Sequence, residues 1–193
     1  MPILGSLAGA STRGFGFGGG SADLVYLDEG AMIPLTSVLV NSTVGTIDIE
    51  NIPSTYKHLV IRGNLLCSAE TSVNVRFNTD SANNYMFQQI YAGSMAVTTD
   101  SNSGTSSAFI GYSVSSTFPA SFTAYIGNYA STSQYKSWVS YSGAMNDSSS
   151  AYSLFTTGAW RNSSTAINKI TFTTGAVNML AKSTLHVYGL KGA

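Results

Sequence analysis

Hydrophobic and polar residues alternate along much of the chain from about Val44 onward, and short clusters of Ser, Asn, Gly and Asp interrupt the alternation. Successive side chains of a β-strand point to opposite faces, so this pattern predicts short antiparallel strands that each bury one face. Within residues 71–78, for example, Val73, Val75 and Phe77 fall on the same face. Similar patterns occupy residues 56–66, 120–128, 134–143, 168–175 and 183–190.

The polar clusters predict the turns, because Ser, Asn, Asp and Gly favour turn conformations. They lie at residues 78–84, 99–107, 146–150 and 161–165. No segment of this region has the apolar spacing of an amphipathic helix. About eight short strands without helices bury their apolar faces best as two packed sheets. The sequence therefore predicts an all-β fold, an antiparallel β-sandwich that is jelly-roll-like or of related Greek-key topology.

The first 20 residues, which include GSLAGASTRGFGFGGG, do not follow the alternation. Their glycines are too frequent for a regular helix, and the segment offers little to a hydrophobic core. We expect an extended N-terminal anchoring arm and connector over residues 1–43 and a β-sandwich domain over residues 44–193. Within the connector, either a first strand near Thr36–Val40 or a fully extended anchor fits the sequence.

Composition limits the partners of the protein. Only 9% of its 193 residues are charged, and nine basic residues balance nine acidic ones. A nucleic-acid-binding surface needs concentrated positive charge, so we expect no nucleic-acid partner. Serine (30 residues) and threonine (20 residues) supply most of the polar surface, and the low net charge favours self-association. No apolar run approaches the roughly 20 residues of a membrane span, so we expect no membrane insertion.

The chemical motifs do not indicate an enzyme. Gly14, Gly16 and Gly19 match the G-x-G-x-x-G dinucleotide fingerprint, but no strand is predicted before them and no helix after them. The two histidines, His58 and His186, lie in alternating strand patterns rather than beside a nucleophile. The single cysteine lies in an apolar run, where an inert buried thiol is expected. We therefore expect no cofactor.

Two polar groupings have competing interpretations. Asp48 and Glu50 share one face of a predicted strand, as a glycosidase pair would, but solvated charges beside a turn explain them better. Asn78, Asp80 and Asn83 offer oxygen ligands to calcium, although one carboxylate without a bidentate Glu is more typical of a polar turn. The sequence thus predicts neither a catalytic site nor a metal site.

Aromatic side chains are the strongest remaining candidates. The chain has eleven Tyr and two Trp among many hydroxyl and amide groups, a combination that suits sugar stacking and adaptable protein contacts. Trp138, Tyr141 and Trp160 are the candidate residues for glycan or subunit contact. All three lie in strand patterns, and filling the sandwich core is the competing explanation.

An ordered series of motifs extends from about Ile52 to Gly192: IPSTYKHL, RFNTDSANNY, GAWRNSSTAINKI and STLHVYGLKG. In these motifs the sequence resembles a recurrent family of tailed-bacteriophage virion proteins, whose members often also begin with a Gly/Phe segment comparable to ASTRGFGFGGG. The family is typically assigned to tail fibres, baseplates or other exposed virion components and has no catalytic residues. The segment LVYLDEGAMIPLTSVLV is longer here than in the family.

The resemblance implies a non-enzymatic virion protein at the particle surface. Its arm would dock on another protein of the baseplate, tail or capsid, with Arg13, Phe15 and Phe17 as the anchoring interface; a buried Phe contributes roughly 1.5–3 kcal/mol. The sandwich, as a homotrimer, would contact a host surface glycan as a tail-fibre or receptor-binding component. Two alternatives stay open: a capsid decoration (cement) protein that stabilises the head, and a free carbohydrate-binding module of a secreted enzyme.

Overall fold

The structure, a computed structural model, describes residues 32–93, 96–113, 115–146 and 151–191. All helical or strand structure within these residues is β-strand. The twelve strands are β1 (Met32–Leu39), β2 (Thr46–Ile49), β3 (His58–Leu65), β4 (Thr71–Phe77), β5 (Tyr85–Gly93), β6 (Ala96–Thr105), β7 (Ala108–Ser113), β8 (Ala120–Ile126), β9 (Lys136–Met145), β10 (Ala151–Trp160), β11 (Ile170–Thr173) and β12 (Thr184–Leu190).

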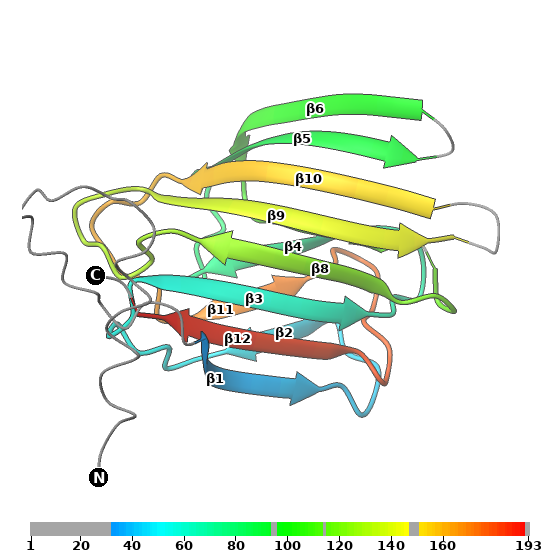
Figure 1. Cartoon of the computed structure of the whole chain (residues 1–193), viewed down its shortest axis with the longest axis horizontal. Coiled ribbons are helices and arrows are strands. Elements are labelled where there is room, and N and C mark those ends of the chain that lie inside the picture. The colour runs from blue at the N-terminus through cyan, green and yellow to red at the C-terminus, as the bar shows by residue number, and fades with distance from the viewer. Residues whose placement is uncertain (1–31, 94–95, 114, 147–150, 192–193) are drawn as a thin grey trace, which may run out of the picture.

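The strands form two antiparallel sheets that pack against each other (Figure 1). The larger sheet has eight strands in the order β1-β12-β3-β8-β9-β10-β5-β6, and the smaller has four in the order β2-β11-β4-β7. In Figure 1 the larger sheet faces the viewer and the smaller sheet lies behind it. This architecture confirms the all-β antiparallel sandwich that the alternation predicts.

The topology is that of a jelly roll with two inserted hairpins. When β5–β6 and β9–β10 are set aside, two four-stranded sheets remain, β1-β12-β3-β8 and β2-β11-β4-β7. Along the chain these strands cross from one sheet to the other at every step except from β4 to β7, as in the paired Greek keys of a jelly roll. We call these eight strands the framework. The two hairpins extend the larger sheet beyond β8.

The core lies between the two sheets, and the alternation assigns it correctly. Val73, Val75 and Phe77 of the smaller sheet have no exposed surface. Ile61 and Val187 of the larger sheet are equally buried and belong to the same cluster. Other residues of the predicted strands that join this cluster include Phe122, Ala124, Ile126, Ile170, Phe172 and Leu185.

The structure differs from two expectations at the edges of the larger sheet. β1 pairs with β12 from Met32 to Leu39, so the sandwich begins no later than Met32 instead of at residue 44. The turn expected at residues 99–107 is mostly strand, because β6 runs to Thr105 and pairs with β5. Cross-strand hydrogen bonds keep this Ser/Asn-rich segment extended although its side chains favour turns.

The inserted hairpins reach beyond the edge of the smaller sheet. β7, the last strand of that sheet, packs against β8, β9 and β10 and only marginally against β5. β6 is hydrogen-bonded to β5 alone, and its residues 96–104 are exposed. In Figure 1, β5 and β6 lie at the top, beyond the other strands. The larger sheet therefore presents a wider surface than a jelly roll alone would have.

Candidate ligand-binding face

The acidic pair considered as catalytic is held in an ion-pair cluster on the smaller sheet. Lys169 Nζ lies 2.9 Å from Asp48 Oδ2 and 2.8 Å from Glu50 Oε1. The Thr171 hydroxyl also donates a hydrogen bond to Asp48. This bond and that of Lys169 lower the pKa of Asp48. Asp48 thus stays ionised and paired, an arrangement suited to stabilising β2 and β11 rather than to proton transfer.

The Asp80 carboxylate, considered above as a calcium ligand, accepts hydrogen bonds from three donors of the protein itself. Its oxygens accept hydrogen bonds from the Ala82 amide (2.9 Å), Asn84 Nδ2 (2.9 Å) and Trp160 Nε1 (2.7 Å). Burial raises the pKa of Asp80, but these hydrogen bonds outweigh it and hold the pKa below its usual value. Within the described ranges, no cluster of three or more His, Cys, Asp or Glu side chains could hold a metal ion.

Asn78 ties the same turn to the connection between β10 and β11. Its Oδ1 accepts hydrogen bonds from the amides of Asn168 and Lys169, and its Nδ2 donates to the Ala166 carbonyl at 2.7 Å. Asn78 has a φ of 53°, a left-handed conformation that Asn tolerates well. The RFNTD motif therefore has a structural role: it joins β4, β5 and β10 at one end of the sandwich.

The remaining sequence candidates fall in three places. His58 lies in β3, where its Nδ1 accepts from the Asn128 amide, and His186 lies in β12 with Nδ1 2.9 Å from Ser37 Oγ. Cys67 is a buried free thiol whose pKa is raised by that burial. The glycine fingerprint and the arm candidates, which are Arg13, Phe15 and Phe17, lie outside the described residues.

The three aromatic candidates separate onto the two faces of the larger sheet. Trp160 is fully buried and Trp138 is 3% exposed; both point to the smaller sheet and fill the core. The Trp138 indole donates to the Phe109 carbonyl at 3.2 Å. Tyr141 is 61% exposed and points the other way. Of the three, only Tyr141 is therefore accessible to a ligand on the described surface.

Tyr141 belongs to a row of residues that crosses the larger sheet on its outer face, the face that points away from the smaller sheet. Tyr141 is paired with Thr123 of β8 and with Phe155 of β10, and Phe155 is paired with Ile90 of β5. The rings of Tyr141 and Phe155 are 5.0 Å apart between centroids. We call the full set the central row: Ser37, His186, Arg62, Thr123, Tyr141, Phe155, Ile90 and Thr99.

A second row beside the central row carries only small side chains. Across β8, β9, β10 and β5 these are Ser121, Gly143, Ser153 and Ala92, which we call the floor row. The side chains of the floor row are small and those of the central row beside it are large. The surface is therefore hollowed above the floor row, over about 490 Å³. Gly143 contributes to the depth of the hollow, since a methyl group there would meet nothing closer than the Tyr152 carbonyl oxygen at 4.0 Å.

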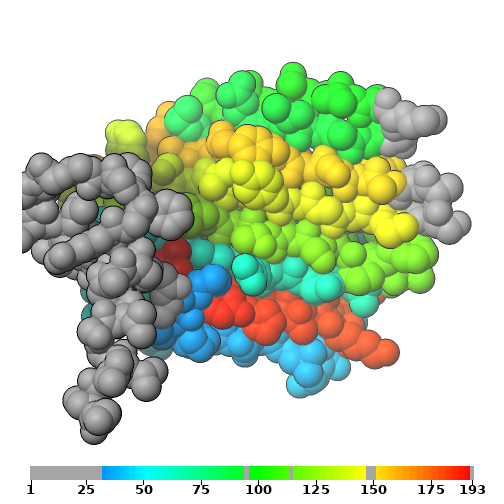
Figure 2. Space-filling view, in the orientation of Figure 1, coloured from blue at the N-terminus to red at the C-terminus, as the bar shows by residue number. Residues whose placement is uncertain are grey.

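A second hollow lies on the other side of the central row. It has a volume of about 550 Å³ and is bordered by side chains from β5, β6 and β10, including Met86, Gln88, Ser101, Thr157 and Ala159. Figure 2 looks onto the outer face, with the bands of β3, β8, β9 and β10 following one another from cyan to orange. Tyr141, Phe155 and Ile90 thus form a ridge between two shallow hollows on an open sheet.

The chemistry of this surface is apolar and hydroxyl-rich. The outward positions of β8, β9, β10 and β5 include no charged residue. Aromatic rings present apolar faces for stacking, and the Tyr, Ser and Thr hydroxyls both donate and accept hydrogen bonds. Such a surface can hold a flat, polyhydroxylated molecule. The outward positions of these four strands include no His, Asp or Glu that could act as a base; the hydrogen-bonded pair of Ser37 and His186 lies at the other end of the central row, on β1 and β12.

Sequence reasoning identified Tyr141 and missed its neighbours. Phe155 and Ile90 reach the same row through pairings between β9, β10 and β5, which the sequence does not reveal. A usable signal existed within β10, because Phe155 and Trp160 are five residues apart and must therefore face opposite sides of the strand. Once Trp160 is assigned to the core, Phe155 points outward.

Comparison of the chain with models of protein families, with curated proteins and with solved structures finds no match. The part of the chain that the structure describes forms no helix that could span a membrane. Fold and surface together define a jelly-roll protein whose larger sheet has an open outer face that is uncharged over β8, β9, β10 and β5. The kinship with phage virion proteins stays a prediction from the sequence motifs.

Proposed function

We propose that this chain is a non-enzymatic structural component of a bacteriophage particle, exposed at the particle surface, and that it binds a glycan of the host surface on the outer face of its larger sheet. The observation that carries the glycan-binding step is the ridge of Tyr141, Phe155 and Ile90 beside the floor row. The sequence motifs shared with virion proteins support the assignment to a particle.

The shape and chemistry of the ridge favour a sugar over a folded protein surface. Sugar rings have an apolar face that stacks on aromatic rings and an edge of hydroxyls that needs hydrogen-bond partners. The ridge offers aromatic rings for the apolar face of the sugar to stack on, and the hydroxyls of Thr123, Ser121 and Ser153 offer hydrogen-bond partners for its edge. The same face also exposes the apolar side chains of Met86, Val97 and Met145. They lie away from the ridge along their strands, so they do not join it into one continuous apolar patch of the kind found in obligate subunit contacts.

The proposed position in the particle combines this face with the N-terminal arm. Residues 1–20, with Arg13, Phe15 and Phe17 as anchors, would dock on a baseplate, tail or capsid protein and leave the sandwich exposed, as a homotrimer. A capsid decoration protein is the alternative, in which the outer face contacts the shell instead. Counting copies per particle separates the two: a few copies on the tail fit a fibre, and hundreds on the head fit a cement protein.

Glycan binding is tested by replacing the exposed ring at the centre of the ridge. We expect Tyr141→Ala to weaken binding to the glycans that the full chain recognises on an array by at least about tenfold, as loss of a central aromatic contact does. Stability should change little, since Tyr141 is mostly exposed. Affinities measured by titration with the best array glycan provide the numbers.

The matched control is Tyr135→Ala. Tyr135 is 59% exposed, almost the same as Tyr141, but precedes β9 and lies outside the ridge. It should bind glycans as the unchanged protein does. Equal effects of the two substitutions, or no glycan bound by the unchanged protein at concentrations up to about 1 mM, would contradict the proposed function.

A further inference from the structure

The central row continues past Tyr141 to a single arginine. Arg62 of β3 is paired with Thr123, which is paired in turn with Tyr141. Neighbouring strands are about 4.8 Å apart, so the Arg62 and Tyr141 backbones are separated by about 9.6 Å with one small residue between them. This span is comparable with two linked sugar rings. A ligand stacked on Tyr141 can therefore reach the Arg62 guanidinium without leaving the row.

Arg62 is exposed, and its guanidinium makes no hydrogen bond or ion pair with any residue that the structure describes. The arginines that border other surfaces are engaged: Arg76 Nε donates to the Ser106 carbonyl at 3.2 Å, and Arg161 donates to the Asn83 carbonyl. A guanidinium has five N–H donors in a planar fork, which matches a carboxylate bidentately. Arg62 thus presents an unused donor set at the end of the ridge.

Among the residues that the structure describes, no negative charge on the outer face competes for Arg62. The described acidic residues all lie elsewhere, on the smaller sheet, in loops or on the inner side of β6; they are Asp48, Glu50, Glu70, Asp80 and Asp100. In the central row the neighbours of Arg62 are His186 and Thr123. The face is therefore neutral over the ridge and positive at one end, a distribution that complements a ligand with neutral sugars and one anionic group.

From this arrangement we infer that the glycan is acidic and that Arg62 binds the carboxylate of a uronic or similar sugar acid whose neighbouring ring stacks on Tyr141. The inference rests on the proposed function, since it names the class of glycan for the same face. Tyr141 and Phe155 supply affinity for the sugar ring, and Arg62 supplies the selectivity for a charged residue in the chain. A single planar carboxylate fits one arginine fork.

The test compares matched ligands and matched variants. Oligogalacturonate and its methyl ester have the same sugar backbone and differ in the carboxylate charge, so they isolate the contribution of Arg62. The full chain should bind the acidic form about tenfold more tightly than the ester. Arg62→Gln keeps a long polar side chain and should remove this preference while leaving binding of the ester unchanged. Lys57→Gln, which removes an exposed positive charge ahead of β3, should keep the preference.

The outcomes separate this inference from the proposed function. If Tyr141→Ala weakens binding of both ligands and Arg62→Gln leaves the acidic preference intact, glycan binding stands and the role of Arg62 is overturned. An array on which Arg62→Gln loses only phosphorylated or sulfated glycans overturns the carboxylate assignment. If neither galacturonan binds, the carboxylated and neutral pairs of the array serve for the same comparison. If the unchanged chain binds no glycan at all, both proposals are overturned.

Discussion

The framework strands and the inserted hairpins differ in how much of their surface they bury. In the framework, the inward positions of β3 and β4 are buried without exception from Leu59 to Leu65 and from Val73 to Phe77. In the hairpins, burial declines from β9 and β10 to β5 and then to β6, whose side chains are almost all exposed. The decline follows the position of β7, the edge of the covering sheet.

This difference shows where stability and surface come from in the molecule. The framework closes a core between two sheets and supplies most of the apolar burial that drives folding. The hairpins extend one sheet beyond the framework. Their inward residues, such as Trp138 and Trp160, still join the core, but their outward residues are free of packing demands. That freedom allows the neutral ridge of Tyr141, Phe155 and Ile90 to lie across three strands, and it predicts that stability and binding can be changed separately.

The largest expected difference is in stability, when the same substitution of Ile by Ala is made in the framework and in a hairpin. Ile61 of β3 is fully buried, whereas Ile90 of β5 is 49% exposed on the ridge. Ile61→Ala should lower the free energy of unfolding by roughly 2–5 kcal/mol, because it leaves a cavity in the core. Ile90→Ala should cost below about 1 kcal/mol and weaken glycan binding instead. Urea unfolding followed by Trp fluorescence measures the first, and titration the second. Similar losses of stability would erase the distinction between the regions.

The sequence predicts the framework better than the hairpins for a physical reason. Framework strands such as β4 and β12 bury one face, so their alternation of apolar and polar residues is strict. β6 is buried on neither face, and nothing constrains its side chains to alternate. Its Asp100–Ser101–Asn102 segment has the composition of a turn, and only the pairing with β5, which is a tertiary property, makes it a strand.

A smaller effect is expected from adding one methyl group on either side of the larger sheet. At Gly158 of β10, a Cβ would overlap the Trp138 ring and the Met86 carbonyl oxygen, so Gly158→Ala should destabilise the protein by roughly 1–3 kcal/mol. At Gly143 of β9, which faces the hollow, a Cβ would come no closer than 4.0 Å to another atom, the Tyr152 carbonyl oxygen, which is an ordinary contact distance. Gly143→Ala should therefore fold as stably as the unchanged protein. Thermal unfolding of both variants checks this, and equal melting temperatures would mean that the inner side of β10 at Gly158 is as open as the outer side of β9 at Gly143.

The candidate site is less predictable than the fold because it depends on register between strands far apart in sequence. Tyr141 can be singled out as an aromatic residue in a strand, and parity even separates it from Trp138, three residues away on the opposite face. Arg62 joins the same row only because β3 pairs with β8 and β8 with β9 in one particular register. A shift of one residue would turn Arg62 inward, and the local sequence does not specify the pairing.

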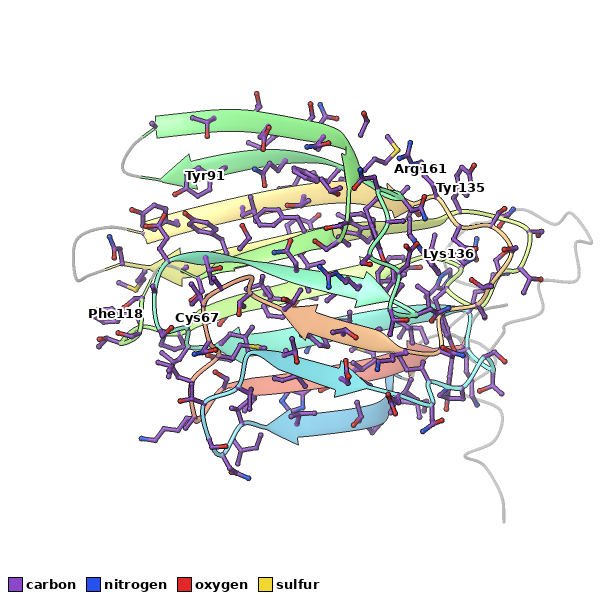
Figure 3. All side chains as sticks on the ribbon, turned by 180° about the vertical axis from the view of Figure 1, so that it is seen from behind. Cys67, Tyr91, Phe118, Tyr135, Lys136 and Arg161 are labelled. Carbon is purple, nitrogen blue, oxygen red and sulfur yellow. The ribbon has the colours of Figure 1, made fainter. Side chains whose placement is uncertain are left out.

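The smallest effect concerns Lys136, a cation on the inner face of β9. Its side chain is buried, its Nζ donates to the Asn162 carbonyl at 2.8 Å, and it lies 5.3 Å from the centroid of the Trp160 ring. Figure 3 shows it near Arg161, at the end of the sandwich opposite Tyr91. Burial lowers the pKa of Lys136, because removing the ammonium from water disfavours its charged form. Replacing such a cation by an apolar residue of similar length is often neutral or stabilising.

Lys136→Met should therefore change the free energy of unfolding by no more than about 1 kcal/mol at pH 7. Its signature is the pH dependence. Between the lowered folded-state pKa of Lys136 and the ordinary value near 10.4, the unfolded chain binds more protons than the folded one, so the unchanged protein gains stability as pH rises through this window. The variant lacks this gain, and its stability relative to the unchanged protein should fall between pH 7 and pH 10.

Tyr85, whose pKa is raised by burial, affects the pH dependence of stability in the opposite sense, but it does so equally in both proteins. Lys57→Met, which removes an exposed lysine, should give a stability–pH curve parallel to that of the unchanged protein. A parallel curve for Lys136→Met as well would show that the ammonium of Lys136 is solvated. The inner face of β9 would then be open to water at this position rather than part of the core.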